Sequence, residues 1–306
     1  MNHLPDQKRS PIRRVFDSWT HLFPSPGLLS HAALFVVIGS GIALAFVYDV
    51  TNPFDSLQVM ILGNAGGTFL RGVHFWSAQL FLILAAIHFA EQLAKERERE
   101  VPLGFWFRFS LLLPLVLFLM ISGFILKGDR GGILARQVAE GLLSTLPLVG
   151  DTVKFLIFGS AQTLELLYVH HIATTTLLVL FFTLEHGRRI WPEWRSLIYV
   201  LTFSMLLSAL RTPVLNPEGT GVHVKGPWYF VGFQEMLHWS ARPGWILGLG
   251  GGLFLALCAL PVLPGSVSKA LKRLMIAVLL AYGGVSVMNW FFRGTDWQWV
   301  VPWGAP

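Results

Sequence analysis

The sequence contains a single cysteine, Cys258, and few charged residues for its length. One thiol excludes a disulfide framework, a cysteine zinc site and a cysteine-ligated iron–sulfur cluster within the chain. It also excludes covalent haem attachment through a Cys-x-x-Cys-His motif. Charged residues make up 13% of the 306 residues, whereas soluble domains carry about 25%. This shortage indicates a chain that is not surrounded by water along its whole length.

Long apolar stretches account for the missing charge. Seven stretches lack Asp, Glu, Lys and Arg altogether: 32–48, 75–90, 109–126, 172–184, 196–210, 243–268 and 274–292. With some flanking residues, each approaches the roughly 20 helical residues that span a bilayer core. Because lipid offers no hydrogen-bond partner to the backbone, each span should be helical. The sequence therefore predicts an all-α, polytopic transmembrane helix bundle with about seven spans.

The distribution of basic residues predicts the orientation of this bundle. The N-terminal segment 1–14 is polar and basic, is interrupted by two prolines, and does not resemble a cleavable signal peptide. If it lies in the cytoplasm, 14 of the 23 Lys and Arg residues fall on the inner side, as the positive-inside rule requires. We therefore interpret the net charge of +6 as membrane topology, and not as affinity for nucleic acid. We expect a multi-pass protein of a bacterial-type inner or energy-transducing membrane.

Four histidines lie near the ends of the second and fourth spans, which run in the same direction. His74 and His88 are 14 residues apart, which corresponds to about 21 Å of helix rise and a difference of only ~40° around the helix. His171 and His186 are 15 residues apart, which gives about 22 Å and ~60°. His170 would lie about 160° from His186. The spacing therefore pairs His74 with His171 at the outer level, and His88 with His186 at the inner level.

Two histidine pairs stacked along the membrane normal can hold two haem irons. Neutral imidazole is a good axial ligand, and ligation by two histidines favours electron transfer over oxygen binding. The alternative is a transporter with hydrogen-bonded histidines, but it does not explain two matched pairs on parallel spans. A zinc site is disfavoured because no carboxylate or cysteine completes it.

Other residues near the histidines fit a haem interpretation. Arg71 lies three residues before His74, on the same helix face, where it is placed to pair with a haem propionate; the alternative is an interfacial snorkelling arginine. Gly27 and Gly41 are 14 residues apart and, with Gly123, offer room for a porphyrin. The alternative for any one glycine is ordinary helix packing.

These residues resemble the cytochrome b family of quinol:cytochrome c and quinol:plastocyanin oxidoreductases over nearly the whole chain. LRGVHFWSAQLFLILAAIH resembles the second helix of the family, with 13 residues between its ligands, and HIATTTLLVLFFTLEH resembles the fourth. LPLVGDTVKFLIFGS resembles the surface helices between the third and fourth spans. GPWYFVGFQEML resembles the segment of the family that carries Pro-Glu-Trp-Tyr. Seven spans resemble the chloroplast-type cytochrome fused to its three-helix companion subunit.

The resemblance implies function, cofactors and partners. It implies two non-covalent haem b groups, quinone as substrate, and the membrane subunit of an electron-transfer complex. Partners would be Rieske-type iron–sulfur or c-type cytochrome subunits in a hetero-oligomer, which in this family can be dimeric. Three regions are expected: a polar or amphipathic lead-in (1–30), a four-helix diheme core (31–195) and a three-helix C-terminal domain (196–306).

Four departures from the family pattern concern its quinone and haem sites. Pro227 stands where the family has the Glu that accepts a proton from quinol, and GFILKGDRGGILA lacks the Trp and Tyr of the family. The first span contains no cysteine, so the sequence does not support the extra covalent haem of chloroplast-type members. The family also has two pairs of glycines beside its haems, and one of these glycines, on the inner half of the third span, is replaced here by Phe109.

Candidate quinone residues lie on both sides of the predicted membrane. Outside, Trp228 and Tyr229 are placed to form an aromatic slot, and Glu235 or Asp129 to accept protons; the alternative for the aromatic pair is an interfacial belt. Inside, Arg188 and Arg189 follow His186 and are placed to bind a quinone or a propionate, or else simply form a basic helix end. A second functional hypothesis is a haem-bearing membrane anchor with a single quinone site.

Overall fold

The computed structural model describes residues 23–160, 163–215, 225–294 and 297–303, and its regular elements there are helices. Their order is α2 (Pro26–Ala45), α3 (Pro53–Gly63), α4 (Ala65–Ala94), η2 (Arg97–Arg99), α5 (Leu103–Ile125), α6 (Arg130–Leu143), α7 (Gly150–Phe158), α8 (Glu165–Val169), η3 (His170–Thr174), α9 (Thr175–Gly187), α10 (Trp194–Leu210), α11 (Val231–Trp239), α12 (Gly244–Ala259), η4 (Leu260–Val262) and α13 (Gly265–Phe292). The predicted all-α class is confirmed.

Six helical segments are long and apolar enough to cross a membrane: α2, α4, α5, the continuous run from α8 to α9, α12 with η4, and α13. A seventh apolar helix, α10, has 17 residues. These seven match the seven predicted spans in order along the chain. The structure differs in detail around the sixth span, because the apolar stretch 243–268 does not form one helix. It breaks at Pro261 and Pro264, which remove backbone donors, and α13 begins at Gly265.

Local sequence explains where the main helices begin. Pro26 occupies the first turn of α2, where its missing N–H costs no hydrogen bond, and Ser25 caps that helix. The Asn64 side chain accepts a hydrogen bond of 2.8 Å from Gly66 N and caps α4. Pro114 lies inside α5, which is tolerated in helices packed among neighbours within a membrane.

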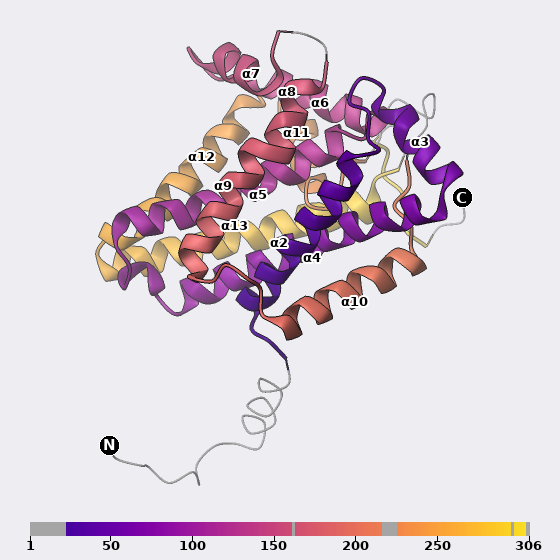
Figure 1. Ribbon diagram of the computed structural model, residues 1–306. Coiled ribbons are helices and arrows are strands. Elements are labelled where there is room, and N and C mark those ends of the chain that lie inside the picture. The colour runs from indigo at the N-terminus through magenta and orange to yellow at the C-terminus, as the bar shows by residue number, and fades with distance from the viewer. Residues whose placement is uncertain (1–22, 161–162, 216–224, 295–296, 304–306) are drawn as a thin grey trace.

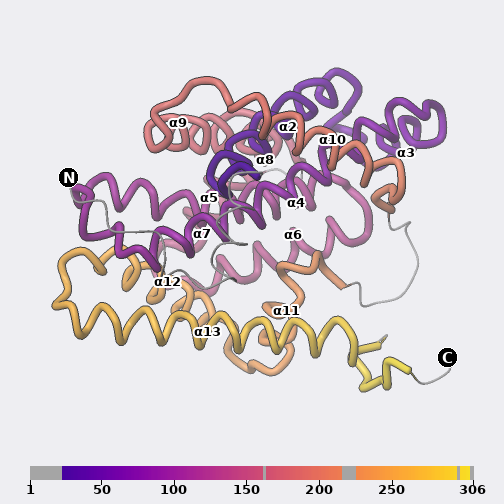
Figure 2. The backbone as a smooth tube through the Cα atoms, turned by 90° about the horizontal axis from the view of Figure 1, so that it is seen from below, coloured from indigo at the N-terminus to yellow at the C-terminus, as the bar shows by residue number. Residues whose placement is uncertain are grey.

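The main core lies among α2, α4, α5, α9 and α10, where Ala32, Ala33, Leu34 and Val179 are almost completely buried. Helix α10 packs against α2 and α4, and Figure 1 shows it running beside α4. Figure 2 shows α12 and α13 along one side of the bundle, opposite α9 and α10. Helix α12 is attached to α5 by the Trp106 indole, which donates a 2.9 Å hydrogen bond to the Leu257 carbonyl.

Candidate haem-binding site

At the level predicted to be the inner one, His88 on α4 faces His186 on α9. Their Nε2 atoms are 3.5 Å apart, and their ring centroids are separated by 5.7 Å. Two imidazole nitrogens that face one another across a helix bundle are the donor set that a bis-histidine iron site requires. Glu91 lies one turn further along α4, with a carboxylate oxygen 3.7 Å from His88 Nδ1.

At the outer level, the Nδ1 atoms of both histidines contact polar groups of neighbouring helices. His74 Nδ1 lies 3.0 Å from the Val37 carbonyl oxygen. A carbonyl can only accept, so this bond requires the proton on Nδ1 and leaves the lone pair on Nε2. His171 Nδ1 lies 2.9 Å from Ser122 Oγ, whose own hydroxyl donates to the Leu119 carbonyl. Such contacts fix ring orientation and increase ligand basicity.

Three glycines give the histidine rings their space. A Cβ atom at Gly41 would lie 3.0 Å from His74 Cε1, and one at Gly27 would lie 2.8 Å from His88 Cε1. A Cβ atom at Gly123 would lie 2.9 Å from His171 Cε1. The structure thus brings each predicted glycine against a predicted ligand.

Two serines, which the histidine spacing alone does not indicate, also lie at the level of His74 and His171. Ser40 Oγ lies 3.2 Å from His74 Nδ1, while Ser122 Oγ contacts His171. Each serine immediately precedes one of the glycines, so α2 and α5 present the same Ser-Gly pair to the two outer histidines. The repeated Ser-Gly dipeptide is the sequence feature that points to these two serines.

The histidine on α9 at the inner level is packed differently. The Phe109 ring stacks on the His186 ring at a centroid distance of 4.6 Å and an angle of 26°. The Nδ1 atom of His186 is buried and has no hydrogen-bond partner among the described residues. Next to this stack, Arg108 donates two hydrogen bonds to the Glu185 carboxylate, at 2.8 and 2.5 Å, and joins α5 to α9.

A π-helical turn accounts for the unequal spacing of the histidines on α4 and on the run from α8 to α9. His171 lies within η3, where the Thr175 amide donates to the His170 carbonyl, five residues back. A π turn accommodates one more residue than an α turn. The 15-residue interval from His171 to His186 therefore has the helical phase of the 14-residue interval on α4. His170 points elsewhere, with Nε2 2.9 Å from the Leu156 carbonyl.

The three predicted arginines lie at opposite ends of the bundle. Arg71 is buried and donates a 2.7 Å hydrogen bond to the Pro213 carbonyl. Arg188 ends α9 in a left-handed conformation with φ 49°, and both Arg188 and Arg189 are exposed. Arg189 is close enough to interact electrostatically with His31, a buried histidine on α2.

The aromatic pair of the predicted outer quinone site lies against the core. The Trp228 indole donates to Gln79 Oε1 at 2.8 Å, and the Tyr229 hydroxyl donates to the Met120 carbonyl at 3.3 Å. Gln79 and Met120 lie on α4 and α5, within about 8 Å of helix rise of His74 and Gly123. Tyr229 and Trp228 are thus at the depth of the outer histidine pair.

The two candidate proton acceptors are both buried, in different surroundings. Asp129 caps α6 by accepting from Gly132 N at 2.9 Å and pairs with Lys127 at 2.8 Å. Glu235 accepts hydrogen bonds from Arg293, Asn289 and Trp297. Burial acts to raise the pKa of the Glu235 carboxyl, but these donors outweigh it and hold the pKa below its ordinary value. A low pKa makes Glu235 a weak base, which works against its predicted role.

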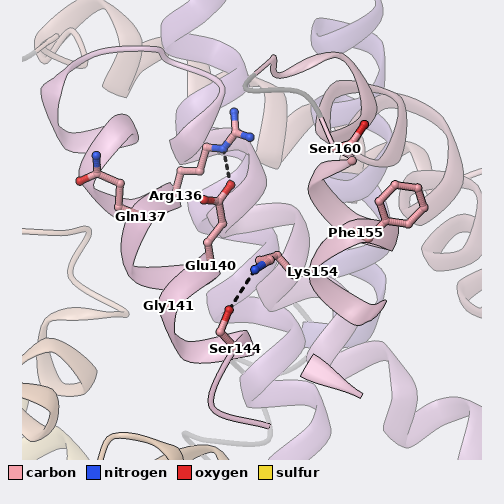
Figure 3. Close-up of a pocket in the computed structure, with 9 residues that line it drawn as sticks. Arg136, Gln137, Glu140, Gly141, Ser144, Lys154, Phe155 and Ser160 are labelled. Carbon is pink, nitrogen blue, oxygen red and sulfur yellow. Dashed lines mark hydrogen bonds and ion pairs between the residues drawn. The ribbon is translucent and has the colours of Figure 1, made fainter. Parts of the chain in front are cut away.

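A separate cavity of about 490 Å³ lies between α6 and α7, outside the histidine region. Figure 3 shows Arg136 paired with Glu140, and Lys154 directed at Ser144. None of the four histidines lines it.

His88 and His186 face one another, and His74 is close enough to His171 to interact electrostatically. Four histidines placed in this way inside a bundle of apolar helices define a polytopic membrane protein with a donor set suited to haem. The model of the family Cytochrome b/b6/petB matches residues 18–189. The chain belongs to the cytochrome b/b6 family, is an integral multi-pass membrane protein, and binds haem b as this family does.

Known proteins resemble both the sequence and the fold. The chain is 30% identical to cytochrome b6 of Heliomicrobium gestii over 156 residues, which cover 48% of this chain and 72% of that protein. It is 28% identical to cytochrome b6 of Heliobacterium modesticaldum, with the same coverage. Its fold is similar to a chain of a hyperthermophilic respiratory complex III, with a TM-score of 0.63 at 15% identity, covering 92% of this chain and 89% of that one.

Proposed function

We propose that this chain is the diheme cytochrome b subunit of a quinol-oxidising membrane complex, and that it carries electrons across the bilayer. The observation that carries the proposal is the arrangement of four histidines in two pairs at two depths, with His88 and His186 facing one another at 3.5 Å. Membership in the cytochrome b/b6 family supports it, as does the similarity of the fold to a complex III chain.

The residues of the chain supply ligands, orientation and exclusion of water. His74 and His171 would hold the outer haem, and His88 and His186 the inner one; once bound, the two haems supply one-electron transfer. The acceptors at Nδ1 of His74 and His171 orient these rings. Buried Arg71 lies at the outer level, where a charged guanidinium would neutralise a propionate.

The outer quinone site would use the segment at Trp228 and Tyr229. Trp228 is partly exposed and supplies an aromatic face, while Tyr229 anchors the segment to α5. A quinol releases protons on oxidation, and the proposed acceptors are Asp129 and Glu235. The inner site would lie beside His186, where Arg188 and Arg189 are exposed. Rieske-type iron–sulfur and c-type cytochrome subunits are the proposed redox partners.

A second candidate is a haem-bearing membrane anchor that exchanges electrons with quinone only at the inner side. It is favoured by Pro227, which has no titratable group, and by the donors that hold Glu235 as a charged carboxylate. Quinol oxidation in Asp129→Asn and Glu235→Gln variants that retain both haems distinguishes the two. A loss of about 10²-fold or more in either identifies a general base at the outer site. Wild-type rates in both favour the anchor.

The principal test is haem stoichiometry. The purified chain should contain two haems b by the pyridine haemochrome assay. His74→Ala, His171→Ala, His88→Ala and His186→Ala should each lose one haem, while His170→Ala should keep both. Two haems in His88→Ala would contradict the ligand assignment, and a haem-free wild-type chain would favour a transporter.

A further inference from the structure

The four predicted ligands are not supported in the same way. Three of them have a glycine against the imidazole ring: His74, His88 and His171. The fourth, His186, has Phe109 in the corresponding place on α5, 14 residues before Gly123. His186 also differs from His74 and His171 in the environment of Nδ1. Its Nδ1 is buried with no partner among the described residues, whereas theirs contact hydroxyl or carbonyl oxygens.

The Phe109 ring is itself held firmly. It stacks on Phe89 of α4 at 5.1 Å and 20°, and Trp106 contacts it at 5.7 Å. His186, Phe109 and Phe89 therefore form a stack of three nearly parallel rings from three different helices. Arg108 and Glu185 immediately precede Phe109 and His186, respectively. Their ion pair, made by two hydrogen bonds, fixes the register of α5 against α9 next to the stacked rings.

We propose that Phe109 is a positioning residue for the inner haem ligand, and that its ring sets the orientation of His186 in place of a hydrogen bond at Nδ1. The inference rests on the proposed function, because it concerns a ligand of the second haem. A histidine whose Nδ1 makes no hydrogen bond is a less basic ligand than one that donates to an acceptor. It therefore favours the ferrous state of its haem relative to the outer site.

The experiment compares four variants of the full chain, each loaded with haem. Phe109→Leu keeps bulk but removes the ring, Phe109→Ala opens space for water at His186 Nδ1, and Phe109→Tyr keeps the ring. The matched control is Phe107→Leu, which removes an exposed phenylalanine from the same helix. Readouts are haem content, the electron paramagnetic resonance spectrum of the oxidised low-spin haems, and redox titration of both haems.

We expect Phe109→Leu to shift the largest g-value of one haem only, because that value reports the relative orientation of the two ligand rings. In Phe109→Ala, water can reach His186 Nδ1, so the same haem should favour the ferric state about tenfold more. Its reduction potential should therefore fall by about 59 mV, the value for a tenfold change in a one-electron couple. Phe109→Tyr and Phe107→Leu should retain the wild-type spectrum and potentials.

The outcomes separate this inference from the proposed function. A wild-type chain without two haems overturns the proposed function. Two haems with unchanged spectra and potentials in Phe109→Leu and Phe109→Ala overturn the role of Phe109 alone. Loss of one haem from Phe109→Leu, with both retained in Phe109→Tyr, supports it because only the ring differs. Changes of equal size in Phe107→Leu contradict it.

Discussion

Glu235 of α11 and Arg293 at the end of α13 form a buried ion pair in which two guanidinium nitrogens lie 2.9 and 2.6 Å from one carboxylate oxygen. Asn289 and the Trp297 indole donate to the other oxygen, at 3.0 and 2.7 Å. This cluster connects the segment containing Trp228 and Tyr229 to the last helix.

Glu235→Gln should therefore destabilise the protein. Removing one partner of a buried pair leaves the other charge uncompensated, which costs about 3–5 kcal/mol. Thermal unfolding in detergent should show a clearly lower midpoint than the wild type. Glu140→Gln is a suitable control, because its partner Arg136 also donates to the Thr163 carbonyl. An unchanged midpoint in Glu235→Gln would show that the cluster carries little stability.

The same carboxylate predicts a pH dependence of stability. Its pKa is lower in the folded protein than in the unfolded chain, so its stabilising contribution is fully present above the unfolded value of about 4.3. The contribution is lost as the pH falls through the folded pKa. The difference in unfolding midpoint between the wild type and Glu235→Gln should shrink below about pH 4. A difference that grows on acidification would reverse the assigned sign.

Gly41→Ala should reduce occupancy of the outer haem, because its Cβ atom would meet the His74 ring at 3.0 Å and displace it. Gly39→Ala on the same helix is the matched control, since a Cβ atom there meets nothing within 4 Å. Reduced-minus-oxidised spectra should show one haem depleted in Gly41→Ala and both retained in Gly39→Ala. Equal haem content in the two variants would mean that the His74 ring can shift without cost.

The π turn predicts an unusual tolerance to deletion. Removing Ala173 should convert η3 to a regular α turn and leave His171 and His186 on a common face, so both haems should remain. Inserting one alanine after Ala173 should instead turn His171 away by about 100°. The insertion should cost the outer haem while leaving the inner one. Visible spectra of the two variants check this, and loss of haem from the deletion alone would contradict it.

No haem should be bound covalently to this chain. Cys258 lies on α12, without the second cysteine and the histidine of an attachment motif. After denaturing electrophoresis, the band should stay dark on haem staining, whereas a c-type cytochrome run beside it should stain.

Much of the fold follows from sequence because lipid imposes length, composition and helical structure on each span. The seven apolar stretches correspond to seven helices, and the depths of the four histidines follow from helix rise. Other features depend on contacts between distant segments. The π turn at His171 has no simple propensity signal, and the four donors around Glu235 come together only when α11 meets α13. The sequence alone therefore offered Glu235 as a proton acceptor without showing the Arg293, Asn289 and Trp297 side chains that bind its carboxylate.

The contact between α10 and α4 has a consequence for assembly. Ser208 donates a 2.7 Å hydrogen bond to the Phe69 carbonyl, and a Cβ atom at Gly72 would come within 2.1 Å of Ser208 Oγ. Trp76 and Arg71 bind the carbonyls of Arg211 and Pro213 just beyond. The fifth span therefore docks on the helix that carries His74 and His88 by a close steric match. If the polypeptide were divided between α9 and α10, the two pieces would still carry complementary surfaces at this contact.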